Sequence, residues 1–395
     1  MVMNMNNKNW VSVWGNAVSI AEHHPEAYAK YITLRYPVYI PFDGDTLRFT
    51  FDNYCGSEAV TVTRATVSAA TSPVYEKMPL ACPCKKETIC DITFSKNESV
   101  TMEAHQTAVS DPVSFPVKKG MTLTVSLYFA DFTLMQSAVL VTGPLSKGFF
   151  SLGDQTHADA LPMDTTKTTI WFYFLSNIEL MTAEENHTVI CYGDSITAGA
   201  WPDYLTLLAR QNPDNHTAFI RRATSGSRVL RQYECITYDS YGLKGTNRFP
   251  HEIPTTGADT VIIQQGINDI IHPVGIETNP FRPMSDLPTV KELIDGYRYY
   301  IEEAKKSHLK VYMGTLLPIF GWRTYATFRD DLRNELNAWI RSAKEIDGCI
   351  DFDLALRGSE NPSAFREGFD SGDHLHPSSK AYQAMAECAY EVLRK

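Results

Sequence analysis

The residue of this chain best placed for chemistry is a serine in a small polar turn. Ser195 follows the apolar, β-branched run 189–192 and Gly193, and Pro202 opens an apolar-periodic stretch a few residues later. This pattern predicts a buried strand, a tight turn and a helix. A serine on such a turn is exposed at the carboxyl edge of a sheet, where it can act as a nucleophile. The alternative is a polar turn in which Asp194 or Ser195 only caps the helix.

A nucleophilic serine needs a base and a group that orients this base, and the C-terminal segment offers both. Asp373 and His376 lie three residues apart in a polar loop, just before the last helical pattern. One loop can therefore present a carboxylate and an imidazole together, at the same sheet edge as Ser195. The alternative is a solvated loop whose aspartate caps a helix and whose histidine is incidental.

Two further polar turns follow strand-like runs between these segments. Gly226 comes shortly after the run 217–222, and a glycine lets the backbone approach a ligand closely. Asn268 comes shortly after the run 260–265, and its side-chain amide can donate a hydrogen bond into a site. Such donors could hold a developing oxyanion, although turn chemistry explains either segment taken alone.

Taken in order, the blocks Gly-Asp-Ser-Ile, Ser-Gly, Gly-x-Asn-Asp and Asp-x-x-His-Pro strongly resemble those of the SGNH (GDSL-type) hydrolase family, over residues 186–395. The resemblance implies that Ser195 is the nucleophile and that Asp373 and His376 complete a catalytic triad. It also implies an oxyanion hole formed by the backbone N–H groups of Ser195 and Gly226 and the side chain of Asn268. Neither a metal nor an organic cofactor is required for this chemistry.

The periodicity of apolar residues changes near residue 183. Residues 1–183 alternate with a period of two between turn clusters, as in 122–129, which indicates half-buried antiparallel strands of a β-sandwich, a jelly roll in our interpretation. Residues 184–395 alternate strand-like runs with amphipathic helices at 289–306, 327–343 and 378–394. This order predicts a parallel sheet with helices on both faces. Together with the resemblance, it implies a three-layer α/β/α, flavodoxin-like domain.

The first half adds a finer resemblance. Trp10, Trp14, Thr33-Leu34-Arg35 and the segment 109–113 are similar to the N-terminal β-domain of one subgroup, whose members are often secreted bacterial carbohydrate esterases. The resemblance implies hydrolysis of short acyl esters, acetyl in the first place, on a small molecule or an oligosaccharide. Trp201 and Trp322 are candidates for stacking on a sugar, and packing in the core is the alternative for both.

Two other functions remain open. A lipid-type acylhydrolase, such as a lysophospholipase or a thioesterase, would use the same catalytic residues with a long apolar groove. A carbohydrate-binding protein with an inactive α/β half would use the β-domain alone, which the filled catalytic positions disfavour.

The composition is that of an ordinary globular protein, with 395 residues of which 44% are hydrophobic and 21% charged. A formal net charge of −10 disfavours nucleic acid or an anionic membrane surface as a partner. No apolar run has the length of a membrane span. Residues 1–10 are polar and lack the apolar centre of a signal peptide, so we expect a cytoplasmic protein unless a leader has been removed.

Eight cysteines are expected to be reduced thiols in a chain of this length without a leader. Cys82, Cys84 and Cys90 are close enough in sequence to suggest a metal clip. They lack the second pair of ligands that zinc sites carry, so we expect a surface loop without a metal.

Overall fold

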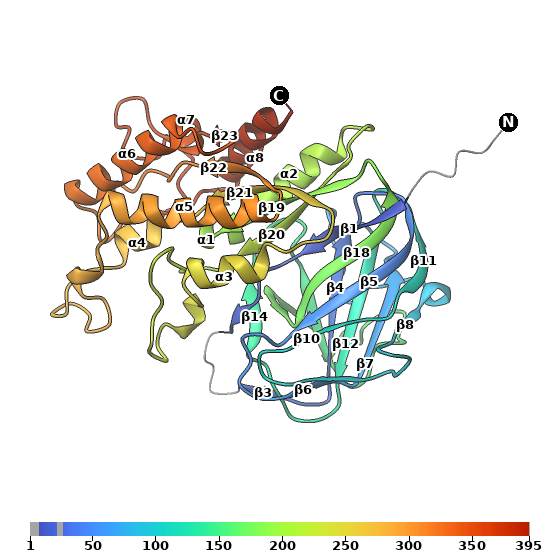
Figure 1. Ribbon diagram of the computed structural model, residues 1–395. Coiled ribbons are helices and arrows are strands. Elements are labelled where there is room, and N and C mark those ends of the chain that lie inside the picture. The colour runs from blue at the N-terminus through green and yellow to red at the C-terminus, as the bar shows by residue number, and fades with distance from the viewer. Residues whose placement is uncertain (1–7, 22–26, 395) are drawn as a thin grey trace. The chain divides into compact units, whose positions relative to one another are not determined.

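The structure is a computed structural model that describes residues 8–21 and 27–394 (Figure 1). Most of the polar N-terminal segment, on which the expected absence of a signal peptide depends, lies outside these residues. The chain divides into two compact units, Met1–Thr188 with Pro213–Ile220, and Val189–Asn212 with Arg221–Lys395. No helix in the described ranges is both long and apolar enough to cross a membrane.

The first unit is built mostly from antiparallel strands. One sheet has the order β1 (Lys8–Gly15), β18 (Leu175–Ala183), β5 (Gly44–Asp52) and β10 (Thr107–Val109), and β11 (Val113–Val117) also pairs with β5. The other has the order β16 (Lys167–Thr169), β15 (Gly148–Leu152), β4 (Ile32–Tyr39), β12 (Thr122–Phe129), β7 (Arg64–Ala69) and β8 (Cys90–Ile92). The predicted β-rich first half is therefore confirmed, and its jelly-roll connectivity stays a prediction.

Short ladders and one helical turn complete this unit. They are β3 (Tyr28–Ala29) with β13 (Thr133–Leu134), β2 (Ser19–Ile20) with β14 (Ser137–Leu140) and β17 (Trp171–Tyr173), β6 (Val60–Val62) with β9 (Val100–Met102), and the 3₁₀ turn η1 (Lys86–Thr88).

Strand β12 is buried along its whole length, so the prediction of a half-buried strand at 122–129 is wrong. One face of this sheet carries Arg35, which pairs with Ser126 of β12. The guanidinium of Arg35 donates to the carbonyl oxygens of Cys82, Gln155 and Ala158 at 2.8–3.2 Å. These bonds hold distant loop segments over a sheet face that the alternation of polar and apolar residues predicts to face solvent.

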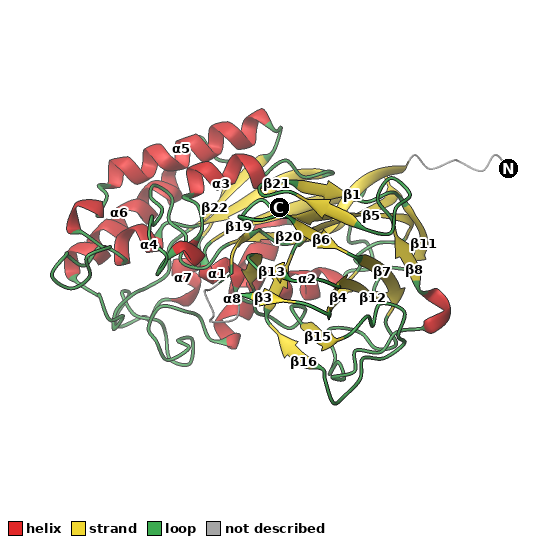
Figure 2. Cartoon of the chain, turned by 90° about the horizontal axis from the view of Figure 1, so that it is seen from below, coloured by secondary structure: helices red, strands yellow, loops and turns green. Residues whose placement is uncertain are grey.

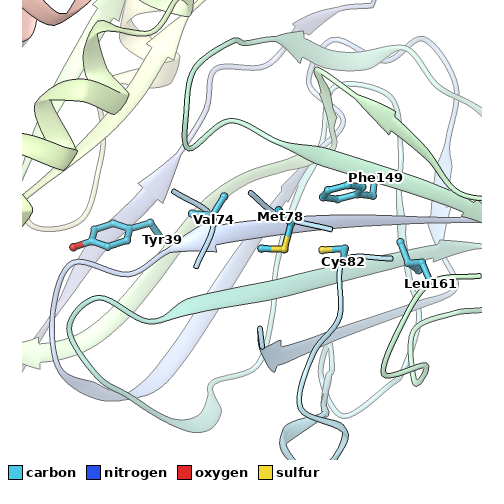
Figure 3. Close-up of a cluster of buried hydrophobic side chains, with 6 residues drawn as sticks. All are labelled: Tyr39, Val74, Met78, Cys82, Phe149 and Leu161. Carbon is cyan, nitrogen blue, oxygen red and sulfur yellow. The ribbon is translucent and has the colours of Figure 1, made fainter. Parts of the chain in front are cut away.

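The same covering segments bury an apolar cluster, shown in Figure 3, that consists of Tyr39, Val74, Met78, Cys82, Phe149 and Leu161. Cys82 is part of this cluster, so the predicted surface loop is wrong at this residue. Burial raises the pKa of the Cys82 thiol to about 12. The cysteine is therefore a small packing residue and carries no thiolate at neutral pH.

The second half of the chain contains a five-stranded sheet with the order β20 (Thr217–Ala223), β19 (His187–Gly193), β21 (Ala258–Gln264), β22 (Lys310–Gly314) and β23 (Gly348–Ile350). The pairs β21–β22 and β22–β23 are parallel. At the start of β19 and β20, His187 N donates to His216 O, and at the end of both strands Thr224 N donates to Gly193 O. Because residue numbers increase in the same direction along both strands, β19 and β20 are parallel too. The predicted parallel-sheet α/β architecture is confirmed.

Two groups of helices cover this sheet. In one group, α8 (Ser379–Leu393) contacts both α2 (Trp201–Arg210) and α7 (Phe352–Leu356). In the other, α5 (Val290–Lys306) contacts α3 (Gly245–Glu252) and α6 (Thr327–Ser342), and α6 contacts α4 (Ile267–Ile271). Figure 2 shows the groups on opposite sides of the sheet. Short turns α1 (Ser195–Ala198), η2 (Asp239–Tyr241) and η3 (Met284–Asp286) lie in the connections.

The helices begin at residues that the sequence marks as caps. Thr289 and Glu292 form a capping box at the start of α5, and the hydroxyl of Ser378 accepts from Ala381 N at the start of α8. Because the strands are parallel, each connection from a strand to the next helix leaves from the same edge of the sheet. The turns that carry the candidate residues therefore share one edge.

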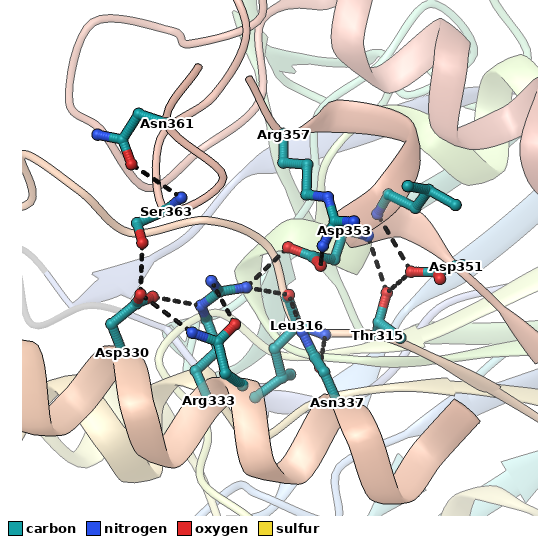
Figure 4. A network of polar contacts seen from close by, with 12 residues as sticks. Thr315, Leu316, Asp330, Arg333, Asn337, Asp351, Asp353, Arg357, Asn361 and Ser363 are labelled. Carbon is teal, nitrogen blue, oxygen red and sulfur yellow. Dashed lines mark hydrogen bonds and ion pairs between the residues drawn. The ribbon is translucent and has the colours of Figure 1, made fainter. Parts of the chain in front are cut away.

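A buried ionic network ties α6 to α7 (Figure 4). The guanidinium of Arg333 donates to Asp330 and to Asp353, both at 2.8 Å, and to the carbonyl oxygen of Leu316 at 3.2 Å. Asn337 donates to the same carbonyl at 2.8 Å and accepts from Leu316 N at 2.7 Å. The network fixes the backbone that follows β22 at the edge where the candidate site lies.

Candidate active site

Strand β19 ends in the turn that carries the serine. A Cβ on Gly193 would overlap the carbonyl oxygen of Gln264 and the side chain of Thr197, so only glycine fits. Asp194 then caps α1, because its carboxylate accepts from Ile196 N at 3.0 Å. The turn thus holds Ser195 as the first residue of a short helix.

The structure brings three of the predicted residues into one hydrogen-bonded chain. Ser195 Oγ lies 2.9 Å from His376 Nε2, and His376 Nδ1 lies 2.6 Å from Asp373 Oδ2. The other oxygen of Asp373 accepts from the backbone N–H groups of His376 at 2.8 Å and Leu375 at 3.0 Å. This is the geometry in which an imidazole can take a proton from a hydroxyl while a carboxylate orients the ring.

The environment of Asp373 keeps it ionised. Partial burial works to raise the pKa of Asp373, but the hydrogen bond from the His376 ring and the bonds from the backbone N–H groups lower it to about 2. The carboxylate therefore carries its negative charge throughout the neutral range, where it can stabilise a protonated His376.

The three expected oxyanion donors each have an N–H group left to donate. The backbone N–H groups of Ser195 and Gly226 donate to no acceptor among the described residues. Asn268 donates one amide hydrogen to Ser227 O at 3.0 Å, which leaves the second one. Gly226 has φ +77°, a left-handed conformation that favours glycine.

Hydrogen bonds join the three turns that carry these donors. Thr224 N donates to Gly193 O at 3.1 Å, which links the second turn to the first. Asp269 accepts from Val229 N at 2.8 Å and Leu230 N at 3.0 Å, which links the third turn to the second. One backbone bond and the carboxylate of Asp269 therefore fix the three turns, and with them the donors, relative to one another.

Asp194 differs from Asp373 in its electrostatics. Complete burial raises the pKa of Asp194 to about 7, although the Ile196 N–H and the charge of Arg248 work to lower it. Its carboxylate interacts with the backbone N–H groups of Ile196 in its own turn and Gly266 in the neighbouring turn, and no histidine among the described residues bonds to it. Its place is that of a cap, as the sequence indicates.

The candidate sugar-stacking tryptophans have different surroundings. Trp201 is completely buried, donates from Nε1 to Thr197 Oγ1 at 3.3 Å and packs against Phe352, so the stacking prediction is wrong for this residue. It is a core residue because it lies against Thr197 of α1 and Phe352 of α7. Trp322 is half-buried, with the guanidinium of Arg323 4.6 Å from its ring, and its role in substrate binding stays a prediction.

Sequence reasoning missed two features of this edge. The imidazole of His374 pairs with Asp370 at 2.5 Å, next to the His376–Asp373 pair. The ring of Tyr241 lies against Gly226, where a Cβ would overlap it. The only sequence signal for the second feature is the group of tyrosines at 233, 238 and 241, after the second turn. In the described part of the chain, no group of three or more His, Cys, Asp and Glu side chains could hold a metal ion.

Comparison with known proteins gives one match of sequence and several of structure. Residues 191–384 match the GDSL-like lipase/acylhydrolase family, and no curated protein matches the chain. A GDSL-like lipase from Bacteroides thetaiotaomicron VPI-5482 is 20% identical, with 53% of this chain and 89% of that chain covered and a TM-score of 0.39. A catalytic mutant of an acetylxylan esterase from Geobacillus stearothermophilus is 16% identical, with 52% and 93% covered and a TM-score of 0.38.

A member of the lipolytic G-D-S-L family from Veillonella parvula DSM 2008 is 18% identical, with 53% of this chain and 99% of that chain covered and a TM-score of 0.36. The sequence match contains Ser195, Gly226, Asn268, Asp373 and His376, all five residues expected to carry out the chemistry. Residues 191–384 therefore form a domain of the GDSL-like lipase/acylhydrolase family, which implies an esterase or acylhydrolase activity.

Proposed function

We propose that the protein is a serine esterase that removes short acyl groups, acetyl in the first place, from a carbohydrate through an acyl-enzyme on Ser195. The observation that carries this proposal is the chain of hydrogen bonds from Asp373 through His376 to Ser195, at 2.6 and 2.9 Å. In this series of hydrogen bonds, His376 is the base and Asp373 is the residue that orients it.

In the first half of the reaction, neutral His376 takes the proton of Ser195 as Oγ attacks the ester carbonyl. The Ser195 and Gly226 N–H groups and the free amide hydrogen of Asn268 hold the negative charge that develops on the carbonyl oxygen. Protonated His376, stabilised by ionised Asp373, then gives its proton to the departing alcohol, and the acyl group stays on Ser195.

In the second half, His376 takes a proton from water, which attacks the acyl carbon. The same three N–H donors hold the second oxyanion, and Ser195 regains its proton as the acid leaves. Because a protonated imidazole cannot accept a proton, each half of the reaction begins with neutral His376.

A carbohydrate as the alcohol part has two supports. Residues 1–183 resemble the β-domain found in bacterial carbohydrate esterases. In addition, half-buried Tyr238 and Tyr241 stack on each other, with ring centroids 5.6 Å apart, and Tyr241 contacts Gly226. Aromatic faces next to an oxyanion donor suit the apolar face of a sugar ring.

The test measures acetate release from acetylated xylan, mannan and pectin oligosaccharides, with aryl acetate hydrolysis as a reference. We expect release from at least one oligosaccharide, and loss of both activities in Ser195→Ala. A fluorophosphonate should label the wild-type protein at Ser195. A folded protein that is not labelled would favour the non-enzymatic alternative, a carbohydrate-binding protein. Hydrolysis of aryl acetate without release from any oligosaccharide would favour an ester outside carbohydrates.

A lipid-type acylhydrolase is the second candidate, and exposed apolar side chains favour it. Four of these lie in the connections after β20 and α4, at the edge that carries the site: Ile236, Ile276, Phe281 and Met284. A comparison of acetyl and octanoyl aryl esters separates the candidates. A clear preference for the octanoyl ester would contradict the acetylesterase proposal.

A further inference from the structure

A cluster of aromatic rings and one arginine lies at the same sheet edge, beside the proposed oxyanion donor Gly226. We call it the Arg282 cluster; it consists of Tyr233, Tyr238, Tyr241, His272 and Arg282. Tyr241 contacts Gly226 and stacks on Tyr238 and on His272, with centroid separations of 5.6 and 5.3 Å. The catalytic steps above use none of these side chains.

Arg282 lies over the outer part of this cluster. Its Cζ atom is 4.3 Å from the ring centroid of Tyr238 and 5.7 Å from that of Tyr233. Two stacked rings, Tyr238 and Tyr241, therefore connect the guanidinium to Gly226. The residue is only 8% exposed, and its Nε lacks a hydrogen-bond acceptor.

Arg282 differs from the other buried arginines because no atom of its guanidinium bonds to an oxygen of the described residues. Eight arginines are buried in the described ranges: Arg35, Arg221, Arg222, Arg228, Arg248, Arg282, Arg329 and Arg333. Seven of them contact a carboxylate or a carbonyl oxygen. The guanidinium of Arg282 has no such oxygen among the described residues, and it lies over the rings of Tyr238 and Tyr233. A buried positive charge normally has an anionic or carbonyl partner. The guanidinium of Arg282 therefore lacks the partner that an anionic ligand could supply.

The nearby carboxylate of Asp286 does not supply this anion. Asp286 already accepts from Arg228 at 3.1 Å and lies 3.5 Å from Arg231. Arg228 also lies over the ring of Tyr233, at 4.3 Å. Burial, and next the positive charges of Arg282, Arg228 and Arg323, lower the pKa of His272 well below its ordinary value. The cluster therefore lies in a positive field within a protein whose formal net charge is −10.

The geometry of the guanidinium suits a planar anion. An arginine whose face lies on aromatic rings keeps the N–H groups along its edge for acceptors. This edge matches the two oxygens of a carboxylate, which can accept two parallel hydrogen bonds. An ester that reaches from Ser195 past Gly226 and across Tyr241 can bring such a group to Arg282.

We propose that the Arg282 cluster is a subsite for a carboxylate on the alcohol part of the ester, so that the preferred substrate is an acidic carbohydrate ester. The proposal rests on the esterase activity proposed above and narrows its substrate class. Arg282 binds the carboxylate, and Tyr238 and Tyr241 present the aromatic surface between it and the oxyanion hole.

The test compares two substrates that differ only in whether their carboxylates are methylated, with the full-length protein at low ionic strength. They are acetylated oligogalacturonides with free carboxylates and the same oligosaccharides with these carboxylates methylated. We expect kcat/KM for acetate release to be about tenfold higher for the free acid, because a charge-assisted bidentate contact is lost on methylation. The ratio should fall to about one in Arg282→Gln and be partly kept in Arg282→Lys.

Arg298→Gln is the matched control. Arg298 of α5 also lies over an aromatic ring, that of Trp339 at 6.0 Å, but it is exposed and paired with Glu345 at 3.3 Å. This variant should keep the wild-type ratio. A ratio near one in the wild type, or one that survives Arg282→Gln, overturns the proposal.

If Arg282→Gln does not fold, a competition experiment on the wild type decides. Galacturonate should inhibit aryl acetate hydrolysis at a lower concentration than its methyl ester, and equal inhibition overturns the proposal. If Ser195-dependent cleavage of aryl acetate is present but the free acid is not preferred over its methyl ester, only the subsite proposal is wrong. A protein that cleaves no ester at all defeats the proposed function, and the subsite with it.

Discussion

At the scale of single residues, two aspartates near Ser195 have opposite properties. Asp373 accepts hydrogen bonds from the His376 ring and from two backbone N–H groups, which hold its pKa at about 2 despite partial burial. Asp194 is fully buried, which raises its pKa to about 7. The difference explains why Asp373 can stabilise a charged imidazole, while Asp194 is suited to capping α1.

The side chain of Asn268 is expected to act on the transition state. Asn268→Ala removes one of three oxyanion donors, so kcat should fall by about 10²–10³ while KM changes little. Steady-state kinetics on an aryl acetate measure the effect, with Asn97→Ala on an exposed turn of the first unit as the control. A variant with wild-type kcat would show that Asn268 does not hold the oxyanion.

The raised pKa of Asp194 makes stability depend on pH. Because the folded protein holds this proton more tightly than the unfolded chain, the contribution to stability is complete below pH 3.8 and is lost as the pH rises to about 7. Asp194→Asn keeps an acceptor for Ile196 N but cannot ionise. The wild type should therefore lose stability relative to this variant between pH 4 and pH 8, by on the order of 4 kcal/mol at most.

Urea unfolding at several pH values measures this difference. The exposed Asp331→Asn on α6 is the control and should leave the pH dependence of the wild type unchanged. A constant difference in unfolding free energy between wild type and Asp194→Asn at all pH values would contradict the assignment.

At the scale of elements, the parallel sheet collects at one edge turns that lie far apart in the sequence. The carboxyl ends of β19, β20 and β21 carry Ser195, Gly226 and Asn268, and the loop before α8 adds Asp373 and His376. Local features hold these turns: Asp194 caps α1 in the first, and Gly226 has a positive φ in the second. The carboxylate of Asp269 in the third turn accepts hydrogen bonds from the segment that follows Gly226. The network around Arg333 does the same for the connection after β22 (Figure 4).

Removal of Arg333 should destabilise α6 and α7. Arg333→Leu leaves Asp330 and Asp353 without their shared buried partner, so we expect the free energy of unfolding to fall by about 3–5 kcal/mol. Arg298→Leu on α5, an exposed arginine paired with Asp295 and Glu345, should cost about 1 kcal/mol or less. Chemical denaturation of both variants tests the contrast, and equal losses would mean that the buried network is not special.

At the scale of the whole molecule, the first compact unit includes a segment from within the second half of the sequence. Residues 213–220, between α2 and the end of β20, group with Met1–Thr188. In the same unit, the buried hydroxyl of Thr188 donates to Ser12 O at 2.7 Å, and Asn186 donates to Thr182 Oγ1 at 2.8 Å. A cut at the predicted boundary between residues 183 and 184 removes these partners.

A fragment of residues 184–395 should therefore be active but less stable than the full chain. It keeps every residue proposed for the chemistry, while Thr188 loses its buried acceptor, a loss of about 1–3 kcal/mol. The midpoint of denaturant-induced loss of aryl acetate hydrolysis should shift to a lower concentration. Thr188→Val in the full chain, which replaces the hydroxyl by a methyl group, should reproduce part of the shift. An unchanged midpoint in the fragment would contradict this account.

Much of the secondary structure of the second half can be predicted from local sequence. The predicted helices at 289–306, 327–343 and 378–394 correspond to α5, α6 and α8 within one residue at each end. Their apolar period and their caps are properties of neighbouring residues, so no knowledge of the fold is needed to find them. The predictions that failed, at strand 122–129, Cys82 and Trp201, all concern what covers a residue from a distance.

The sequence by itself determined the β-rich first half, the parallel α/β second half and the ordered blocks that carry Ser195, Gly226, Asn268, Asp373 and His376. Only the tertiary structure decided that His376 reaches Ser195, that distant loops bury β12 and Cys82, and that Arg282 lies over tyrosines beside Gly226. The physical reason is that periodicity and turn chemistry depend on neighbours in the chain. Burial and the pairing of charges instead depend on segments that only folding brings together.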